Sequence, residues 1–252
     1  QIGRHGRFQR FRADVRPWFW FLTRTADCRI FQAMTVVDIV SEVLKDHPNA
    51  DYEFQVTESY RTWDYCVQYR ETDFNFISRL LEHEGIFYYF KHSDGHHTMV
   101  MTDSSAKLTP FEGYEQIKYV EPSQFVRADV ETISQWTFAR EVQPGEYAHT
   151  DYDLKNPSVN LMKRRTLPRG YEPSKYEIYD YPGEYAQRFD KPDANQSDLN
   201  KEATVTARLR MEEEETPHCV SGGSSNGRKL SAGTVFNLAA HPCADFNQAY
   251  LV

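Results

Sequence analysis

Two stretches in the first half of the chain repeat apolar residues at helical spacing. One begins at a Thr35-x-x-Asp38 start signal and runs to the helix-stopping Pro48. The other follows Asp73, which we expect to cap it, and ends at Gly85, where a left-handed backbone costs least. The pattern predicts helices near residues 36–46 and 74–84.

Elsewhere apolar and polar residues alternate with the period of strands. The alternation covers Phe8 to Thr25, residues 52–56 and residues 65–69, and Asp94-Gly95 is a hairpin turn signal between strands at 86–90 and 98–101. Beyond about Tyr114 the helical period fades. We expect strands at 125–130, 133–138, 177–181, 234–238 and 249–252, a helix or long strand at 187–211, and an exposed loop at 212–227.

This distribution predicts a mainly β protein with two helices grouped in its first half, and 252 residues allow one domain or two. The 16 Phe, 16 Tyr and 4 Trp among 252 residues also favour strands. The formal charge of −8 opposes nucleic acid and anionic membranes as main partners. We expect no membrane-spanning segment, because no apolar run approaches the ~20 residues that cross a bilayer.

The chain termini and cysteines bear on where the protein is made. Residues 1–7 lack the apolar core of a signal peptide, and without an initiator Met the chain is expected to be a piece of a longer one. The cysteines are too widely spaced for a disulfide framework, so we expect free thiols in a reducing compartment. They are Cys28, Cys66, Cys219 and Cys243.

One motif suggests a hydrolase. Gly223-Ser224-Ser225-Asn226-Gly227 fits the G-x-S-x-G nucleophile pattern, with Ser225 as nucleophile. That chemistry needs a strand before the serine, a helix after it, and then an acid followed by a His. Here His241 precedes Asp245, and a flexible Gly/Ser loop explains the motif more simply.

Other polar groups suggest metal or acid/base sites, and each has a simpler reading. His92, His96 and His97 cluster beside Asp94 at a hairpin tip, where polar residues are common. His218-Cys219 with His241 and Cys243 supplies four zinc-type ligands, although at no standard spacing. Adjacent helical side chains diverge by about 100°, so Glu82, His83 and Glu84 read as a solvated helix end. Asp180, Glu184 and Glu212–Glu215 read as surface charge. We therefore expect no catalytic, cofactor or metal site.

Longer blocks point to a family. Asp27-Cys28-Arg29-Ile30-Phe31-Gln32 and the runs 15–23, 65–74 and 76–88 resemble the VgrG spike proteins of type VI secretion. Later matches, in family order, are residues 151–153, 179–183, 236–238, 241–242 and 250–252. They extend over nearly the whole chain.

The resemblance implies a structural, non-enzymatic hub built from two β-barrel-like domains with an α+β insertion, similar to contractile-phage baseplate hubs. The first barrel portion and the α+β segment would occupy approximately residues 1–114, and the second, mostly β domain residues 115–252. It implies a homotrimer on the hexameric Hcp tube, continuing into an OB-like domain and a β-helix spike capped by a PAAR protein, and carrying effectors or adaptors. Assembly would occur in the bacterial cytoplasm, followed by injection through the type VI apparatus. Both downstream parts are absent from these 252 residues, and the short segment before Phe8 leaves the first barrel incomplete. A phage or prophage tail hub is the close alternative, and a serine hydrolase using Ser225 is the alternative of a different class.

Overall fold

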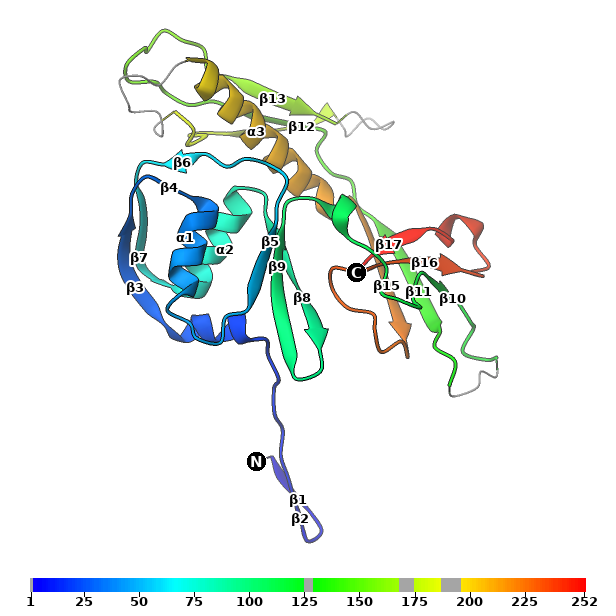
Figure 1. The fold of residues 1–252 in the computed structure, drawn as a ribbon. Coiled ribbons are helices and arrows are strands. Elements are labelled where there is room, and N and C mark those ends of the chain that lie inside the picture. The colour runs from blue at the N-terminus through cyan, green and yellow to red at the C-terminus, as the bar shows by residue number, and fades with distance from the viewer. Residues whose placement is uncertain (1, 125–128, 168–174, 187–195) are drawn as a thin grey trace. The chain divides into compact units, whose positions relative to one another are not determined.

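The computed structural model describes residues 2–124, 129–167, 175–186 and 196–252 (Figure 1). The chain forms two compact units, Gln1–Ser104 and Ser105–Val252. The sequence placed the boundary near residue 114. Residues 105–114 join the second unit because Tyr114 packs with Ile117 and Ile133 there. That the units correspond to two barrel-like domains stays a prediction.

Unit 1 is an α+β unit whose strands form small sheets. Its strands are β1 (Gly3–His5), β2 (Phe8–Arg10), β3 (Ala26–Phe31), β4 (Met34–Thr35), β5 (Tyr52–Gln55), β6 (Thr62–Trp63), β7 (Cys66–Thr72), β8 (Phe87–Ser93) and β9 (His96–Thr102), and its helices are η1 (Trp18–Arg24), α1 (Val36–Leu44) and α2 (Asp73–His83). The sheets are β1–β2, β3–β7, β4–β6 and β5–β9–β8. Figure 1 shows α1 and α2 between the β3–β7 pair and the β5–β9–β8 sheet.

The local signals for both helices act largely as expected. Thr35 and Asp38 form a reciprocal capping box at the start of α1. At α2 the cap is Thr72, whose hydroxyl accepts from Asn75 N, so the prediction that Asp73 caps this helix is wrong. Asp73 is the first helical residue and is buried. Gly85 ends α2 with a φ of 72°, as predicted.

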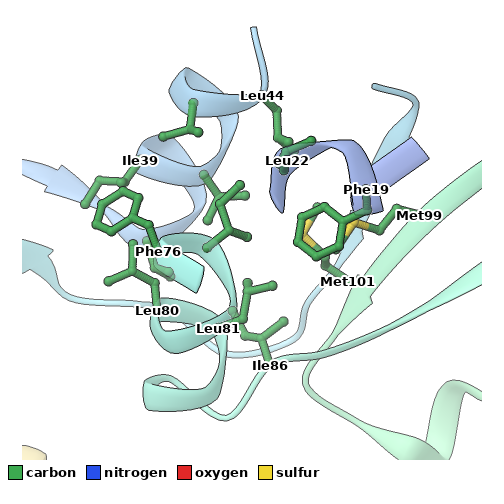
Figure 2. Packing of buried hydrophobic residues seen from close by; sticks show 14 of the residues in the cluster. Phe19, Leu22, Ile39, Leu44, Phe76, Leu80, Leu81, Ile86, Met99 and Met101 are labelled. Carbon is green, nitrogen blue, oxygen red and sulfur yellow. The ribbon is translucent and has the colours of Figure 1, made fainter. Parts of the chain in front are cut away.

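The core of unit 1 is filled from helices and sheets together. Figure 2 shows side chains from η1, α1, α2 and β9 converging on one centre. Phe19, Ile39, Phe76 and Met101 are each at most 2% exposed. Burial of this kind stabilises a fold by roughly 1.5–3 kcal/mol per large side chain. The two helices therefore stay in place through their apolar stripes.

Unit 2 has one long helix and more strands. Its elements are η2 (Ser105–Lys107), β10 (Gln116–Lys118), β11 (Ile133–Arg140), β12 (Glu146–His149), β13 (Lys163–Thr166), β14 (Glu177–Asp180), α3 (Gln196–Glu215), η5 (Thr216–His218), β15 (Cys219–Ser225), β16 (Val235–Ala239), η6 (Ala244–Phe246) and β17 (Ala249–Leu251). Strands β10–β16–β17, β11–β15 and β13–β12–β14 form separate sheets. The helix α3 packs on β12 and β13 (Figure 1).

Two predictions need correction, one of a strand and one of a loop. Of the strand expected from Phe8 to Thr25, only Phe8–Arg10 forms, and Trp18–Arg24 are the 3-10 helix η1. Residues 11–17 form no strand, and Phe11 and Val15 are exposed, because no neighbouring strand in the described part of the chain pairs with them. Residues 212–227 are no loop: α3 continues to Glu215, and β15 pairs antiparallel with β11. The strand expected at 65–69 is confirmed as β7, and Tyr65, which precedes β7, and Tyr69 are exposed.

Two other predictions fall partly outside the described residues. The strand expected at 125–130 includes residues 125–128, and the helix or strand expected at 187–211 includes residues 187–195, which the structure does not describe. The described part of the second stretch is helical from Gln196.

Candidate functional site

Ser225 lies at the end of β15, where its hydroxyl serves the backbone. Its Oγ donates to Thr132 O at 2.8 Å and accepts from Gly227 N at 2.9 Å. The motif is followed by a turn and not by a helix. His241 Nδ1 accepts from Cys243 N at 3.0 Å. The hydroxyl proton of Ser225 is therefore directed to a carbonyl oxygen, and the geometry gives the serine a structural role.

The proposed metal-ligand sets do not converge. Across residues 2–124, 129–167, 175–186 and 196–252, no three His, Cys, Asp or Glu side chains are placed to hold a metal ion. His218 Nδ1 contacts Glu141 O at 2.7 Å, and the His241 ring lies between Tyr119 and Phe246.

The histidines of the β8–β9 hairpin have separate partners. His97 Nε2 accepts from Trp18 N at 2.9 Å, which ties the start of η1 to β9. His96 Nε2 lies 2.6 Å from Asp51 Oδ2, and His92 stacks on His97 with ring centroids 5.7 Å apart. Their observed contacts stabilise unit 1.

The end of α2 is less solvated than the sequence suggests. Glu84 Oε1 accepts from Arg61 Nη2 at 2.8 Å and from Trp63 Nε1 at 3.1 Å. The Glu84 side chain is only 9% exposed, so the interpretation of this residue as a solvated helix end is wrong. The reason is long-range: Arg61 and Trp63 precede it by more than twenty residues.

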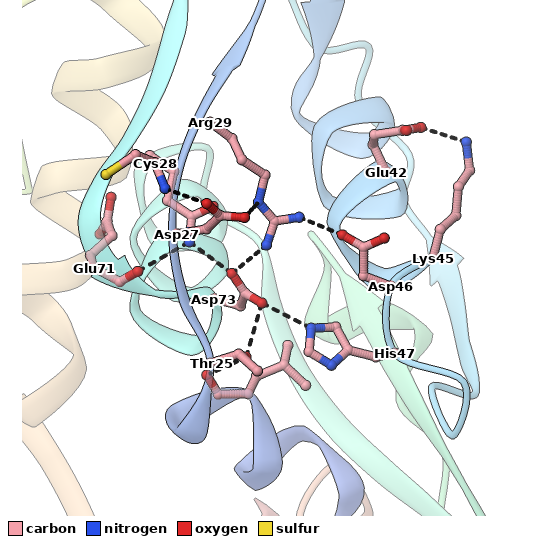
Figure 3. Close-up of polar contacts among 12 residues, drawn as sticks. Thr25, Asp27, Cys28, Arg29, Glu42, Lys45, Asp46, His47, Glu71 and Asp73 are labelled. Carbon is pink, nitrogen blue, oxygen red and sulfur yellow. Dashed lines mark hydrogen bonds and ion pairs between the residues drawn. The ribbon is translucent and has the colours of Figure 1, made fainter.

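A buried carboxylate, Asp73, is the centre of a polar cluster in unit 1 (Figure 3). Its Oδ1 accepts from Arg29 Nη2 at 2.6 Å and Gln68 Nε2 at 2.8 Å. Its Oδ2 accepts from Thr25 Oγ1 at 3.0 Å and lies 3.0 Å from His47 Nε2. The partners come from β3, β7 and the segments next to η1 and α1, so one side chain links four regions of the unit.

The electrostatics of this cluster keep Asp73 ionised. Burial raises the pKa of its carboxyl, but the hydrogen bonds from Gln68, His47 and Thr25, with the charge of Arg29, outweigh burial and lower that pKa. Both carboxylate oxygens are occupied by protein donors. The arrangement stabilises structure and leaves Asp73 poorly placed to accept a proton from a substrate.

Unit 2 contains an apolar groove with a volume of about 600 Å³. Its walls are β15 and β17, and aromatic side chains from β11, β16 and β17 line it: Trp136, Phe138, Phe236 and Tyr250. Gly223 sits under Trp136 so closely that a Cβ would lie 2.7 Å from the indole. The groove is suited to apolar contact, since few charged groups line it.

A second apolar surface lies on unit 1, on the outer face of the β3–β7 pair. Ile30 pairs with Val67, and Cys28 pairs with Tyr69. Ile30 is 61% and Tyr69 65% exposed. Exposed apolar faces of this kind are typical of association surfaces. The alternation of Tyr65, Val67 and Tyr69 in the sequence indicates a strand but not which of its faces is exposed, so this surface was not predicted.

Comparison with known protein families resolves what kind of protein carries these surfaces. The family model described as phage tail baseplate hub (GPD) matches residues 1–252. The chain belongs to this family. The hub domain therefore extends over the whole chain.

Curated relatives are spike proteins. The chain is 38% identical over 252 residues to the type VI secretion system spike protein VgrG1a of Pseudomonas aeruginosa, and 39% identical over 247 residues to VgrG1c of the same organism. It spans 37% and 32% of the lengths of those proteins. The predicted resemblance to VgrG proteins is confirmed.

Solved structures support the fold. The E. coli c3393 protein, described as a type VI secretion component structurally similar to the T4 bacteriophage tail proteins gp27 and gp5, matches with a TM-score of 0.55 at 18% identity, over 93% of this chain and 47% of that one. The 43 kDa tail protein of prophage MuSo2 from Shewanella oneidensis matches with a TM-score of 0.57 at 11% identity, over 88% and 60% of the two chains. The mainly β fold class of phage-hub type is confirmed. Within the described residues, no helix has the length and apolarity needed to cross a membrane.

Proposed function

We propose that this chain is the hub portion of a type VI secretion spike and acts as a structural subunit without catalytic activity. The observation that carries the proposal is the 38–39% identity to two VgrG spike proteins over at least 98% of the chain. The local geometry agrees with it, because Ser225, Glu84 and Asp73 are all engaged in holding the fold together.

In this role the chain forms a homotrimer that docks on the Hcp tube. The full-length spike is capped by a PAAR protein and carries effectors or adaptors, and it assembles in the bacterial cytoplasm before injection. The exposed β3–β7 face and the apolar groove of unit 2 support association with other subunits. Cyclic assembly is a common way to bury such surfaces.

Light scattering after size exclusion tests the association of these 252 residues. A mass three times 29.5 kDa is expected for the trimer. A monomer at all concentrations would contradict the proposal that these residues contain enough of the interface. Mixing with purified hexameric Hcp then tests docking: co-elution is expected, and separate elution of two intact proteins would contradict it.

A phage or prophage tail hub is the second candidate, and the structural match to the MuSo2 tail protein favours it. The neighbouring genes separate the two: type VI genes support the secretion role, and tail-assembly genes support the phage role. A further relative, the actin cross-linking toxin VgrG1 of Vibrio cholerae, is 28% identical, and the match covers 22% of its length. The activity in that name is a property of that protein.

A further inference from the structure

The helix α3 is attached to its sheet by a narrow row of side chains. Its buried residues are spaced by four and lie on one face: Leu199, Ala203, Ala207 and Met211. Two of these four are alanines, which bury little apolar area. A 20-residue helix held by so small a row is sensitive to the loss of any one contact with the sheet.

His149, the last residue of β12, lies under the middle of this row. It is fully buried, and its Nε2 contacts Ala203 O at 2.8 Å. A carbonyl oxygen can only accept, so Nε2 carries the hydrogen and the neutral ring has its lone pair on Nδ1. The hydrogen bond joins the sheet directly to the backbone of α3.

The Nδ1 atom is enclosed. Among the described residues it has no hydrogen-bond partner. Gly183 covers it so closely that a Cβ there would lie 2.9 Å from Nδ1, and Gly183 N donates to Thr150 O to hold this position. The Tyr185 ring packs 4.8 Å from the imidazole. A proton added at Nδ1 would therefore find no acceptor in the closed structure.

In the described part of unit 2, the charged and titratable groups around His149 do not supply one. Asp151 is occupied by the backbone amides of Tyr152 and Ala186. Asp180, opposite His149 on β14, accepts from the Tyr147 hydroxyl. The remaining groups are Lys163, opposite His149 on β13, Arg210 on α3, and the Tyr185 phenol. Burial is the largest effect and lowers the pKa of His149, although Ala203 O and the two carboxylates oppose it.

We propose that His149 is an acid-sensitive clamp on α3: protonation of its imidazole at Nδ1 releases α3 from the β12–β13–β14 sheet, while the β11–β15 pair stays folded. The proton comes from solvent, and no other bond is made or broken except the hydrogen bonds that α3 loses. The clamp is a property of unit 2 alone and does not depend on the proposed hub function.

The direction of the effect follows from linkage. A His that is protonated at an ordinary pKa of 6.5 in the open state and excluded from protonation in the closed state favours opening as the pH falls. For one such group the opening equilibrium rises by up to about 30-fold between pH 7.5 and pH 5.0. The change levels off above about pH 7.5, where the ring is mostly neutral in both states.

Hydrogen exchange on the dilute 252-residue protein tests this, with rates corrected for the intrinsic effect of pH. Peptides from Gln196–Glu215 are expected to open at least tenfold more at pH 5.0 than at pH 7.5, and peptides from β11 and β15 less than twofold more. In His149→Gln the side-chain amide can still donate to Ala203 O but cannot gain a proton, so its α3 peptides are expected to show no such change. His92→Gln, at an exposed position on β8, is the matched control and keeps the wild-type response.

Three results would overturn the clamp: pH-independent exchange of α3 in the wild type, an equal response in His149→Gln, or opening of all of unit 2 together. If His149→Gln does not fold, measurements on the wild type alone still test the clamp. A single-proton clamp requires the opening of α3 to rise at most tenfold per pH unit, while the NMR ring signals of His149 in the closed state stay those of the neutral ring. A steeper rise, or a His149 ring that titrates while α3 remains protected, would refute it.

Discussion

Asp73 shows how much of unit 1 depends on one ionised side chain. Its partners Arg29 and His47 are 44 and 26 residues away in sequence, and its carboxylate is 3% exposed. A buried charge is tolerated only where other groups solvate it, and here four protein donors do so. Removal of the charge leaves Arg29 without its shortest ion pair.

We expect Asp73→Asn to lower the free energy of unfolding by about 2–4 kcal/mol at pH 7. Urea unfolding followed by tryptophan fluorescence measures the change. Asp46→Asn is the matched control, because Asp46 also pairs with Arg29 at 2.8 Å but is 69% exposed. It is expected to cost less than about 1 kcal/mol. Equal effects of the two variants would contradict the importance of burial.

The stability difference between the wild type and Asp73→Asn is also expected to depend on pH. The pKa of Asp73 is lowered in the folded state, so its contribution is fully present above the ordinary value of 3.8 and is lost as the pH falls towards the folded-state value. The stability difference between wild type and Asp73→Asn is therefore expected to shrink below about pH 4. A difference that stays constant down to pH 3 would count against an ionised Asp73.

Substitution of Ser225 tests the hydrolase hypothesis. Ser225→Ala removes the hydrogen bonds to Thr132 O and Gly227 N and is expected to cost about 1 kcal/mol of stability. Hydrolysis of p-nitrophenyl acetate is expected to be the same for variant and wild type. Ser224→Ala, at the exposed neighbouring position, is the control. A turnover that disappears only in Ser225→Ala would restore the hydrolase hypothesis.

At the scale of elements, the end of α2 combines several local rules. Gly85 N donates to Glu82 O at 3.1 Å and Ile86 N to Leu81 O at 2.8 Å, which is the Schellman pattern. Ile86 and Leu81 are both in the core of unit 1. The positive φ of Gly85 is therefore fixed by contacts on both sides of it.

Gly85→Val is expected to destabilise unit 1 by at least about 1 kcal/mol, because a β-branched residue resists positive φ. The midpoint of urea unfolding measures it. Glu82→Ala, an exposed substitution in the last turn of the same helix, is expected to change the midpoint little. An unchanged midpoint in Gly85→Val would show that the chain relaxes at this turn.

The elements that sequence predicted correctly are those determined within a few residues. The capping box at Thr35, the glycine at the end of α2 and the Asp94-Gly95 turn between β8 and β9 are of this kind. Each depends on a backbone preference of the residues themselves. Their positions in the structure agree with the prediction to within one or two residues.

The errors concern features that depend on distant partners. β15 is rich in Gly and Ser and has no intrinsic strand pattern, and it forms because β11, about 85 residues earlier, pairs with it. Residues 11–17 have the pattern without the partner. Likewise, the donors to Glu84, and all those to Asp73 except Gln68, lie more than twenty residues away in sequence. Sequence therefore predicted the helices and turns better than the buried polar sites.

Each of the two units has its own hydrophobic core. The largest apolar cluster consists entirely of residues between Trp18 and Met101, and the cluster around Ile133 and Phe236 belongs to residues 114–250. The Asp73 cluster also lies within residues 1–104. A compact set of contacts with its own hydrophobic core is characteristic of a domain that can fold alone.

We expect a polypeptide of residues 1–104 to fold without the rest of the chain. Its urea unfolding should be cooperative, and Trp18, which is 5% exposed, should be shielded from acrylamide quenching in the absence of urea. The same polypeptide with Leu80→Ala, a fully buried position, is the control and should unfold at markedly lower urea. Non-cooperative unfolding of the parent polypeptide would show that unit 1 needs unit 2.

Because Cys66 is buried in the core of unit 1, a reagent can reach its thiol only when that core opens. Three thiols, Cys28, Cys219 and Cys243, are exposed, whereas Cys66 is 4% exposed and burial raises the pKa of its thiol. A maleimide reagent should therefore label three sites at once and the fourth only as fast as unit 1 opens. The rate at which mass spectrometry detects the fourth label therefore measures how fast the core of unit 1 opens. No engineered probe is needed.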